Sequence, residues 1–294
     1  MRLSARYFAS GIVVGLFLLL SYFYSLPDGR LHIIFCDVGQ GDAIYINTPA
    51  NKDMLIDGGP DDSVLVCLGK HMPFYDRTID VAVLSHPQKD HLYGFISVLQ
   101  RYRVKYIVIG IEGNDIEEYK ILKRIIQEKK IVVKNLYAGD EFFLGQVNAK
   151  ILWPQKQWVA MRVEQFDPPG VLDNRVLGFN TNQDVNLFSP YILVSLGNFK
   201  ALFTGDGGRD IQSEVEKSNN LLSVNLLKVP HHGSKTALLP EFLKKVRPQI
   251  AIISVGKNSY GHPAAETLKL LQDMGATIRR TDREGDIEII SDGN

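Results

Sequence analysis

The segment Val81-Ala-Val-Leu-Ser-His-Pro-Gln-Lys-Asp-His-Leu-Tyr-Gly94 decides the fold. Its apolar start predicts a buried strand, and His86, Asp90 and His91 follow at a turn into a predicted helix. Imidazole and carboxylate groups are suitable ligands for Zn²⁺ or Mn²⁺. The alternative is a polar loop in which Asp90 caps the helix. The segment favours a metal site at the end of a strand.

The same arrangement recurs at four other predicted strand ends, each followed by an acidic residue or a histidine. These ends are residues 54–56 before Asp57, 200–203 before Asp206, 224–229 before His231 and His232, and 250–255 before His262. One aspartate after a strand is usually a turn residue. Five such positions in one chain indicate a common rim of a sheet.

Short apolar runs alternate with helical patterns along the rest of the chain, which predicts an α/β fold with helices outside the sheet. The predicted helices are 63–71, 92–102, 115–129, 209–217, 240–246 and 263–274. Residues 156–186 show little periodicity and predict a long loop. No Pro/Ser-rich linker divides residues 28–294, so we expect a single domain there.

The composition excludes several classes of protein. With 294 residues, 45% of them hydrophobic, the chain is too apolar for a disordered protein. Two cysteines are too few for a disulfide-stapled scaffold. An exported chain could oxidise Cys36 and Cys67. Both lie in apolar runs, however, where free cysteine is commonly a small buried hydrophobe, so we expect them to be unpaired.

The N-terminus carries a membrane signal. Residues 7–27 contain no charge, and Arg2 and Arg6 precede them. About 20 apolar residues in a helix can cross a bilayer, and basic flanks favour the cytoplasmic side. We expect residues 1–27 to form a cytoplasmic stub and a transmembrane anchor, with residues 28–294 on the outer side of the cell membrane. A cleaved signal peptide and a buried core helix are the alternatives.

An ordered set of motifs resembles the metallo-β-lactamase fold. The set is Asp57-Gly-Gly59, Ser85-His-Pro-x-x-Asp-His91, Thr204-Gly-Asp206, His231-His-Gly-Ser234 and Tyr260-Gly-His-Pro263. With Asp37-Val-Gly-Gln-Gly-Asp-Ala43 and Arg280-Thr-Asp-Arg-Glu-Gly285, the chain more narrowly resembles the extracellular hydrolase domain of ComEC-type competence proteins. The resemblance implies an αββα sandwich with a metal site at one edge of its two sheets.

The resemblance also implies roles for individual residues. The expected ligands of one or two Zn²⁺ or Mn²⁺ ions are His86, Asp90, His91, Asp206 and either His231 or His232, with Asp57 supporting the site from behind. Gln88 departs from the motif, because the wider fold has histidine there and the ComEC-like subgroup usually has aspartate. No histidine lies between His91 and Asp206, and Asn186 is the nearest subgroup-like residue.

For catalysis, Asp90 is expected to orient a hydroxide, and His231, His232 and His262 to support the site or protonate a leaving group. Lys235 and Lys257 are candidate phosphate contacts, or else solvated loop lysines.

The resemblance favours phosphodiester hydrolysis, with single-stranded DNA as a candidate substrate. The alternatives are another ester, lactam or nucleotide substrate, or a metal-poor binding module. Residues 27–294 carry 31 basic and 33 acidic residues, a net of −2, because the total of 33 basic residues includes Arg2 and Arg6. That balance does not favour strong non-specific DNA binding.

Overall fold

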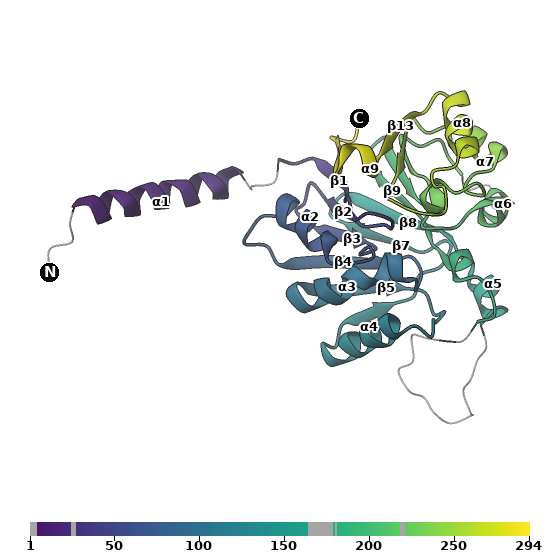
Figure 1. The fold of residues 1–294 in the computed structure, drawn as a ribbon, viewed down its shortest axis with the longest axis horizontal. Helices are drawn as coiled ribbons and strands as arrows, with labels where there is room; N and C mark the ends of the chain where they lie inside the picture. Colours follow the sequence, from purple (N-terminus) through teal and green to yellow (C-terminus); the bar gives the residue numbers. More distant parts are fainter. Residues whose placement is uncertain (1–4, 25–27, 164–178, 180, 218–220) are drawn as a thin grey trace.

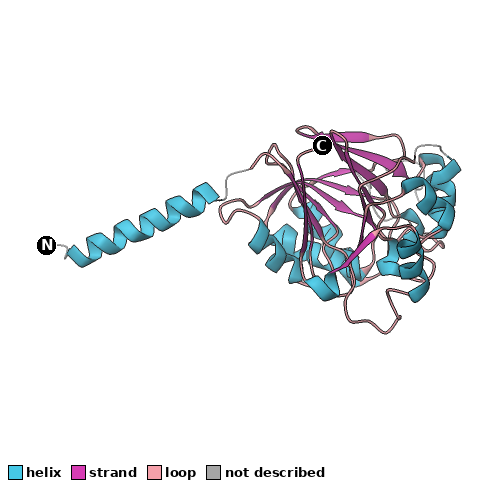
Figure 2. Ribbon diagram, turned by 90° about the horizontal axis from the view of Figure 1, so that it is seen from above, coloured by secondary structure: helices cyan, strands magenta, loops and turns pink. Residues whose placement is uncertain are grey.

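The computed structural model describes residues 5–24, 28–163, 179, 181–217 and 221–294. Two sheets of seven strands each form its centre, and their strand orders are β14-β1-β2-β3-β4-β5-β6 and β13-β12-β11-β10-β9-β8-β7 (Figures 1 and 2). The first contains β1 (Leu31–Phe35), β2 (Ile44–Asn47), β3 (Asp53–Ile56), β4 (Thr78–Leu84), β5 (Arg103–Ile109), β6 (Val132–Lys134) and β14 (Ile287–Ser291). The second contains β7 (Glu141–Leu144), β8 (Val147–Trp153), β9 (Tyr191–Leu196), β10 (Phe199–Phe203), β11 (Leu226–Lys228), β12 (Ile250–Ile253) and β13 (Thr277–Arg280).

Helices cover the outer faces of the two sheets, which gives a four-layer αββα sandwich and confirms the predicted architecture (Figure 2). Those near the first sheet are α2 (Ser63–His71), α3 (Lys89–Arg101) and α4 (Glu117–Glu128). Those near the second are α6 (Arg209–Lys217), α7 (Pro240–Val246) and α8 (Ala265–Asp273). Short helices α5 (Lys156–Ala160), α9 (Thr281–Glu284), η1 (Val185–Phe188) and η2 (Pro230–Gly233) lie in the connections.

The space between the sheets is filled by one face of each strand. Along β1, Leu31, Ile33 and Phe35 belong to the cluster between the sheets, whereas Ile34 belongs to the cluster under the helices. The ring of Phe35 lies 6.2 Å from that of Phe203 in β10, centroid to centroid. Because both faces are buried, the strands read as continuous apolar runs.

Parallel pairing brings the predicted strand ends together. Strands β3 and β4 run parallel, as do β10, β11 and β12. The carboxyl ends of parallel strands meet at one edge of a sheet, so the residues after them gather there. This edge of the two sheets carries the group of acidic and histidine side chains described in the next subsection.

The N-terminal helix α1 (Ala5–Tyr24) projects from the two-sheet body (Figure 1). Among the helices in the described part of the chain, none is sufficiently long and apolar to cross a membrane. The predicted loop 156–186 contains α5 and the first two residues of η1, while residues 164–178 and 180 lie outside the described residues.

The prediction that the cysteines are unpaired was wrong. Cys36 and Cys67 are both buried, as expected, but they form a disulfide with their Cα atoms 5.7 Å apart. Cys36 directly follows β1 and Cys67 lies in α2, so the packing of α2 on the first sheet brings them together. Their separation of 31 residues gives no local signal of this contact.

Candidate metal centre

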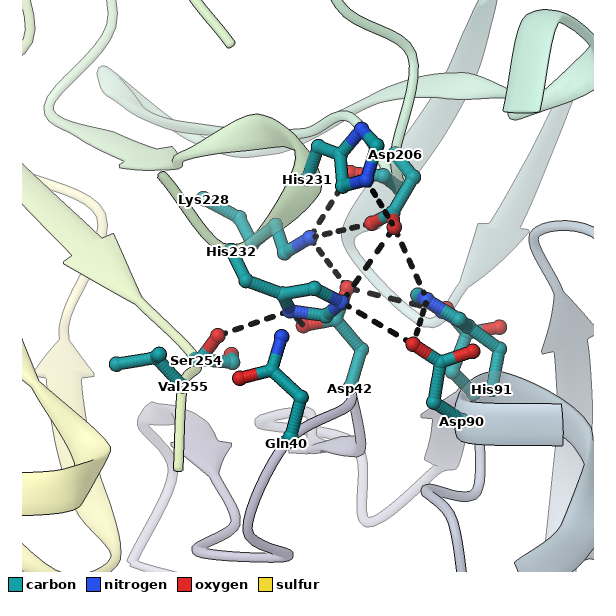
Figure 3. A network of polar contacts seen from close by, with 12 residues as sticks. Gln40, Asp42, Asp90, His91, Asp206, Lys228, His231, His232, Ser254 and Val255 are labelled. Atoms are coloured by element: carbon teal, nitrogen blue, oxygen red, sulfur yellow. Dashed lines mark hydrogen bonds and ion pairs between the residues drawn. The ribbon is translucent and has the colours of Figure 1, made fainter. Parts of the chain in front are cut away.

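Four acidic and histidine side chains converge at the edge between the two sheets (Figure 3). Asp90 and His91 lie in the first turn of α3, Asp206 follows β10, and His232 lies in η2 after β11. Asp206 Oδ2 lies 3.4 Å from both His91 Nε2 and His232 Nε2, and Asp90 Oδ2 lies 3.5 Å from His232 Nε2. One ligand atom from each residue lies within 4.8 Å of all the others.

His91 is held by Asp57, the residue that follows β3. His91 Nδ1 lies 2.8 Å from Asp57 Oδ2, and Asp57 also accepts hydrogen bonds from the backbone N–H and hydroxyl of Ser85. Asp57 has a φ of 59°, so the chain turns sharply at the end of the strand. This contact directs His91 Nε2 toward the cluster, as carboxylates do for metal-binding histidines.

Two glycines permit that arrangement. A Cβ atom on Gly94 would lie 1.9 Å from the backbone oxygen of Gly58, and one on Gly58 would lie 2.5 Å from the nitrogen of Phe95. Only glycine tolerates such proximity. The first turns of α3 therefore pack directly against the loop after β3, which places His91 beside Asp57.

His232 is held from the other sheet. Its Nδ1 lies 2.9 Å from the carbonyl oxygen of Ser254, which follows β12, and the imidazole donates this hydrogen bond. His231 and His232 have φ values of 49° and 50°, in the left-handed region. This strained turn buries His232 and leaves the side chain of His231 34% exposed. His232, rather than His231, thus presents its Nε2 to the cluster.

Three of the buried ligand atoms make no hydrogen bond in the described part of the chain, although they lie within ion-pairing distance of charged neighbours. Within the described residues, His91 Nε2, His232 Nε2 and Asp206 Oδ1 accept or donate no hydrogen bond. Buried polar atoms normally make hydrogen bonds, so a group of buried atoms without them indicates a site for a ligand. Two imidazoles and two carboxylates are a donor set that fits a divalent metal ion such as Zn²⁺ or Mn²⁺.

The charges in the cluster are strongly coupled. Burial opposes the charged form of His232, but Asp206 outweighs it and raises the pKa of His232 to about 9. Burial alone would raise the pKa of the Asp206 carboxyl, but His232 and His91 outweigh this effect and hold that pKa well below its ordinary value. The carboxylates thus require compensating positive charge, which protons or a metal ion can supply.

Sequence reasoning missed a buried ion pair behind the cluster. Lys228 Nζ contacts Asp42, donates to the carbonyl of Gly205 and lies 3.6 Å from Asp206 Oδ1. Both Lys228 and Asp42 are essentially inaccessible to solvent. A lysine inside the apolar run 224–229 was the available signal, because a charge in a buried strand requires a partner.

Two expected ligands lie beside the four-residue cluster rather than in it. His86 is buried with its ring 4.1 Å from that of His91, but its Nε2 lies 3.2 Å from Gln88 Oε1. His231 Nε2 lies 4.0 Å from Asp206 Oδ2. The structure therefore brings Asp90, His91 and Asp206 together, and of the two alternatives His231 and His232 it places His232 in the cluster.

A cleft of about 610 Å³ opens onto the cluster. His231, His262, Lys257, Gln88 and Asn186 line it together with the exposed parts of Asp90, Asp206 and His232. Lys235 does not line this cleft, and its Nζ lies 3.2 Å from Glu266. The expected substrate contact of Lys235 is therefore not supported by its position, whereas Lys257 faces the cleft.

The two-sheet sandwich with this edge site defines a metallo-β-lactamase fold protein. The metallo-β-lactamase fold protein YhfI of Bacillus subtilis superposes with a TM-score of 0.54 at 10% identity, over 89% of this chain and all of that one. No protein-family model matches the chain.

Within this fold the chain resembles ComEC-type competence proteins. It is 28% identical to ComE operon protein 3 of Bacillus subtilis over 93% of the chain, and 28% identical to competence protein ComA of Neisseria gonorrhoeae over 90%. These matches cover 34% and 33% of the two relatives, so the chain spans about a third of their length.

Proposed function

We propose that this chain is a metal-dependent hydrolase that cleaves phosphodiesters. The observation that carries the proposal is the convergence of the buried atoms His91 Nε2, His232 Nε2 and Asp206 Oδ1, which make no hydrogen bond among the described residues, beside a cleft that Asp206 and His232 line. Asp90, His91, Asp206 and His232 would hold the ion. When bound, it would supply Lewis-acid chemistry that polarises the scissile group and lowers the pKa of water.

Side chains of the cleft would supply the proton transfers and the substrate contact. Asp90 is 35% exposed and reaches both the cluster and the cleft, so it can accept a proton from the attacking water and orient it. His231 and His262 line the same cleft with their rings 5.6 Å apart, where either can protonate a leaving oxygen. Lys257, exposed at the rim, can contact a phosphate.

The substrate proposal rests on the resemblance to competence proteins. Single-stranded DNA, a phosphodiester polymer, is the substrate we propose for this cleft. The cleft presents imidazole, lysine and amide side chains that can donate hydrogen bonds to a phosphate.

We also propose that the uncharged N-terminal segment, residues 7–27, anchors the domain to the cell membrane with the domain outside the cytoplasm. Tyr7 to Pro27 carry no charge, and Arg2 and Arg6 precede them. The disulfide between Cys36 and Cys67 supports an oxidising location. Carbonate-resistant membrane association, together with protease access from the outer side of intact cells, tests this topology. Release of the protein by carbonate would contradict it.

A second candidate function is a non-catalytic binding module, and Gln88 favours it. Gln88 stands at the N-cap of α3 beside His86, where a charged or imidazole ligand would complete a second metal position. A neutral amide there is a weak ligand. Hydrolysis of another ester, lactam or nucleotide remains the alternative within the hydrolase class.

One experiment separates these functions. The purified full chain is loaded with Zn²⁺ or Mn²⁺, and hydrolysis of single-stranded DNA and of bis(p-nitrophenyl) phosphate is measured together with metal content. We expect metal-dependent cleavage of both, lost in Asp206→Asn and retained in Asp210→Asn, a matched change at an exposed position in α6. Metal binding without cleavage of either substrate would favour the binding module.

A further inference from the structure

A second groove lies at the opposite edge of the first sheet. It has a volume of about 770 Å³ and is formed where α3 leads into β5 and α4 leads into β6. Strands β4, β5 and β6 run parallel, and the metal centre follows the carboxyl end of β4. The groove, at the start of these strands, shares no lining residue with the metal cleft.

The lining of this groove is basic. It contains five cationic side chains and no carboxylate, the cations being Arg101, Arg103, Lys105, Lys129 and Lys130. Asp80, outside the lining, pairs with Lys105 at 2.6 Å, and Lys129 Nζ donates to the carbonyl of Leu99.

The other three cations are uncompensated. Arg101, Arg103 and Lys130 are exposed, and none has a carboxylate at ion-pairing distance in the part of the chain that the structure describes. In a chain whose basic and acidic residues balance, this concentrates positive charge on one short strip.

The backbone at Lys130 gives an independent indication. Lys130 follows the C-cap of α4 and has a φ of 52°; its N–H donates to the carbonyl of Gln127, and the N–H of Ile131 donates to the carbonyl of Ile126. This helix ending normally uses glycine, because a side chain is strained in the left-handed region. Glycine would serve the fold at least as well, so the strained lysine points to a role for its charge.

An exposed aromatic ring accompanies the cations. Tyr106 in β5 is 45% exposed and lines the groove, while Tyr102 is buried and accepts a hydrogen bond from Arg77. Sites for single-stranded nucleic acid combine cations, which contact the phosphates, with an exposed aromatic ring on which a base can stack. A membrane surface is flat and would contact residues that protrude from the protein, whereas these residues line a groove.

We propose that this groove is a second, non-catalytic site that binds the backbone of a single-stranded polynucleotide. Arg101, Arg103 and Lys130 contact its phosphates, and Tyr106 stacks on a base. The inference rests on the proposed phosphodiesterase function, which it deepens by supplying a place to hold the polymer away from the metal centre. It also explains how a chain without excess positive charge retains a polyanion.

The test is fluorescence anisotropy with a labelled oligo-dT and the purified full chain, in EDTA so that no cleavage occurs. The groove variant is Arg103→Gln with Lys130→Gly, and the control is Lys244→Gln with Arg283→Gln, which removes two exposed positive charges elsewhere. We expect the groove variant alone to bind about tenfold more weakly, with a salt slope smaller by about 1.4. Tyr106→Ala is expected to weaken binding about tenfold by loss of stacking.

Several outcomes distinguish this proposal from its rivals. Equal loss in the control pair, or unchanged affinity in the groove variant, overturns it. Binding to phosphatidylglycerol vesicles but not to oligo-dT, lost in the groove variant, also overturns it and assigns a membrane surface. Hydrolysis of bis(p-nitrophenyl) phosphate should be unchanged in the groove variant. If no variant hydrolyses that ester yet oligo-dT binding depends on the groove, the hydrolase proposal fails and the groove remains.

Discussion

His91 Nδ1 lies 2.8 Å from Asp57 Oδ2, and this contact fixes which ring nitrogen faces the metal centre. The two residues come from different elements, α3 and the loop after β3, and Asp57 is itself anchored by Ser85. An imidazole that donates from Nδ1 keeps a lone pair on Nε2 for a ligand. The pair therefore couples the first sheet to the metal centre.

Asp57→Asn should weaken metal binding about 10- to 100-fold, because an amide orients His91 less firmly and makes it a poorer ligand. Isothermal titration with Zn²⁺ or Mn²⁺ measures the change. Asp273→Asn, at an exposed position that pairs with Lys269, is the matched control and should bind as the unmodified chain does. An unchanged affinity in Asp57→Asn would remove Asp57 from the support of the site.

Lys228→Met should lower the free energy of unfolding by about 3–5 kcal/mol, because Asp42 is then buried without its counter-ion. Urea denaturation in EDTA measures this. The double variant Lys228→Met with Asp42→Asn should recover part of the loss, since the unpaired charge is gone. Additive losses in the double variant would show that the two residues do not act as a pair.

Gln88→Asp should raise the metal content from one ion per chain toward two. His86 Nε2 lies 3.2 Å from Gln88 Oε1, and burial together with His91 lowers the pKa of His86 to about 3, so its imidazole is neutral and able to bind. A carboxylate at position 88 supplies a stronger, charged ligand beside it. Equilibrium dialysis with elemental analysis gives the stoichiometry.

The control for that experiment is Gln157→Asp, which adds the same charge at an exposed position in α5. It should leave the metal content at one ion per chain. A content of two in the unmodified chain would show that Gln88 does not limit the second position.

Glu112 should make the protein less stable as the pH rises. Burial raises the pKa of this carboxyl to about 8 from its ordinary 4.5, and its Oε1 has no hydrogen-bond partner among the described residues. Between these values the folded chain keeps a proton that the unfolded chain releases. Stability therefore falls with pH, by up to about 5 kcal/mol in total.

Thermal unfolding of Glu112→Gln against pH tests this. The variant lacks the titrating group. The difference between its Tm and that of the unmodified chain should therefore shift in favour of the variant as the pH rises from 5 to 8, a range that lies between the two pKa values. A constant difference across that range would contradict the raised pKa.

Much of the fold was predictable because its signals are local. The apolar runs that become β4, β9 and β12 are continuous in the sequence, and periodicity places α2 and α6 at their observed bounds. The expectation that strand ends carry the site needed only the rule that parallel strands end at one edge. In the structure, Asp90, His91 and Asp206 lie together at that edge.

Contacts between distant segments were not predictable in this way. The pairing of Cys36 with Cys67 and of Asp42 with Lys228 depends on how helices and sheets pack, and neither leaves a periodic signal. The same holds for Lys130, whose strained conformation and exposed charge become meaningful only beside Arg103 in the groove.

The sequence by itself determined the order of strands and helices and the residue types at the sheet edge, because apolar periodicity and strand-end chemistry are properties of short segments. Only the tertiary structure decided that His232 and not His231 faces Asp206, because the left-handed turn in η2 and the hydrogen bond to Ser254 fix the direction of each ring. Direction in space is set by contacts among segments that are remote along the chain, and no local pattern records it.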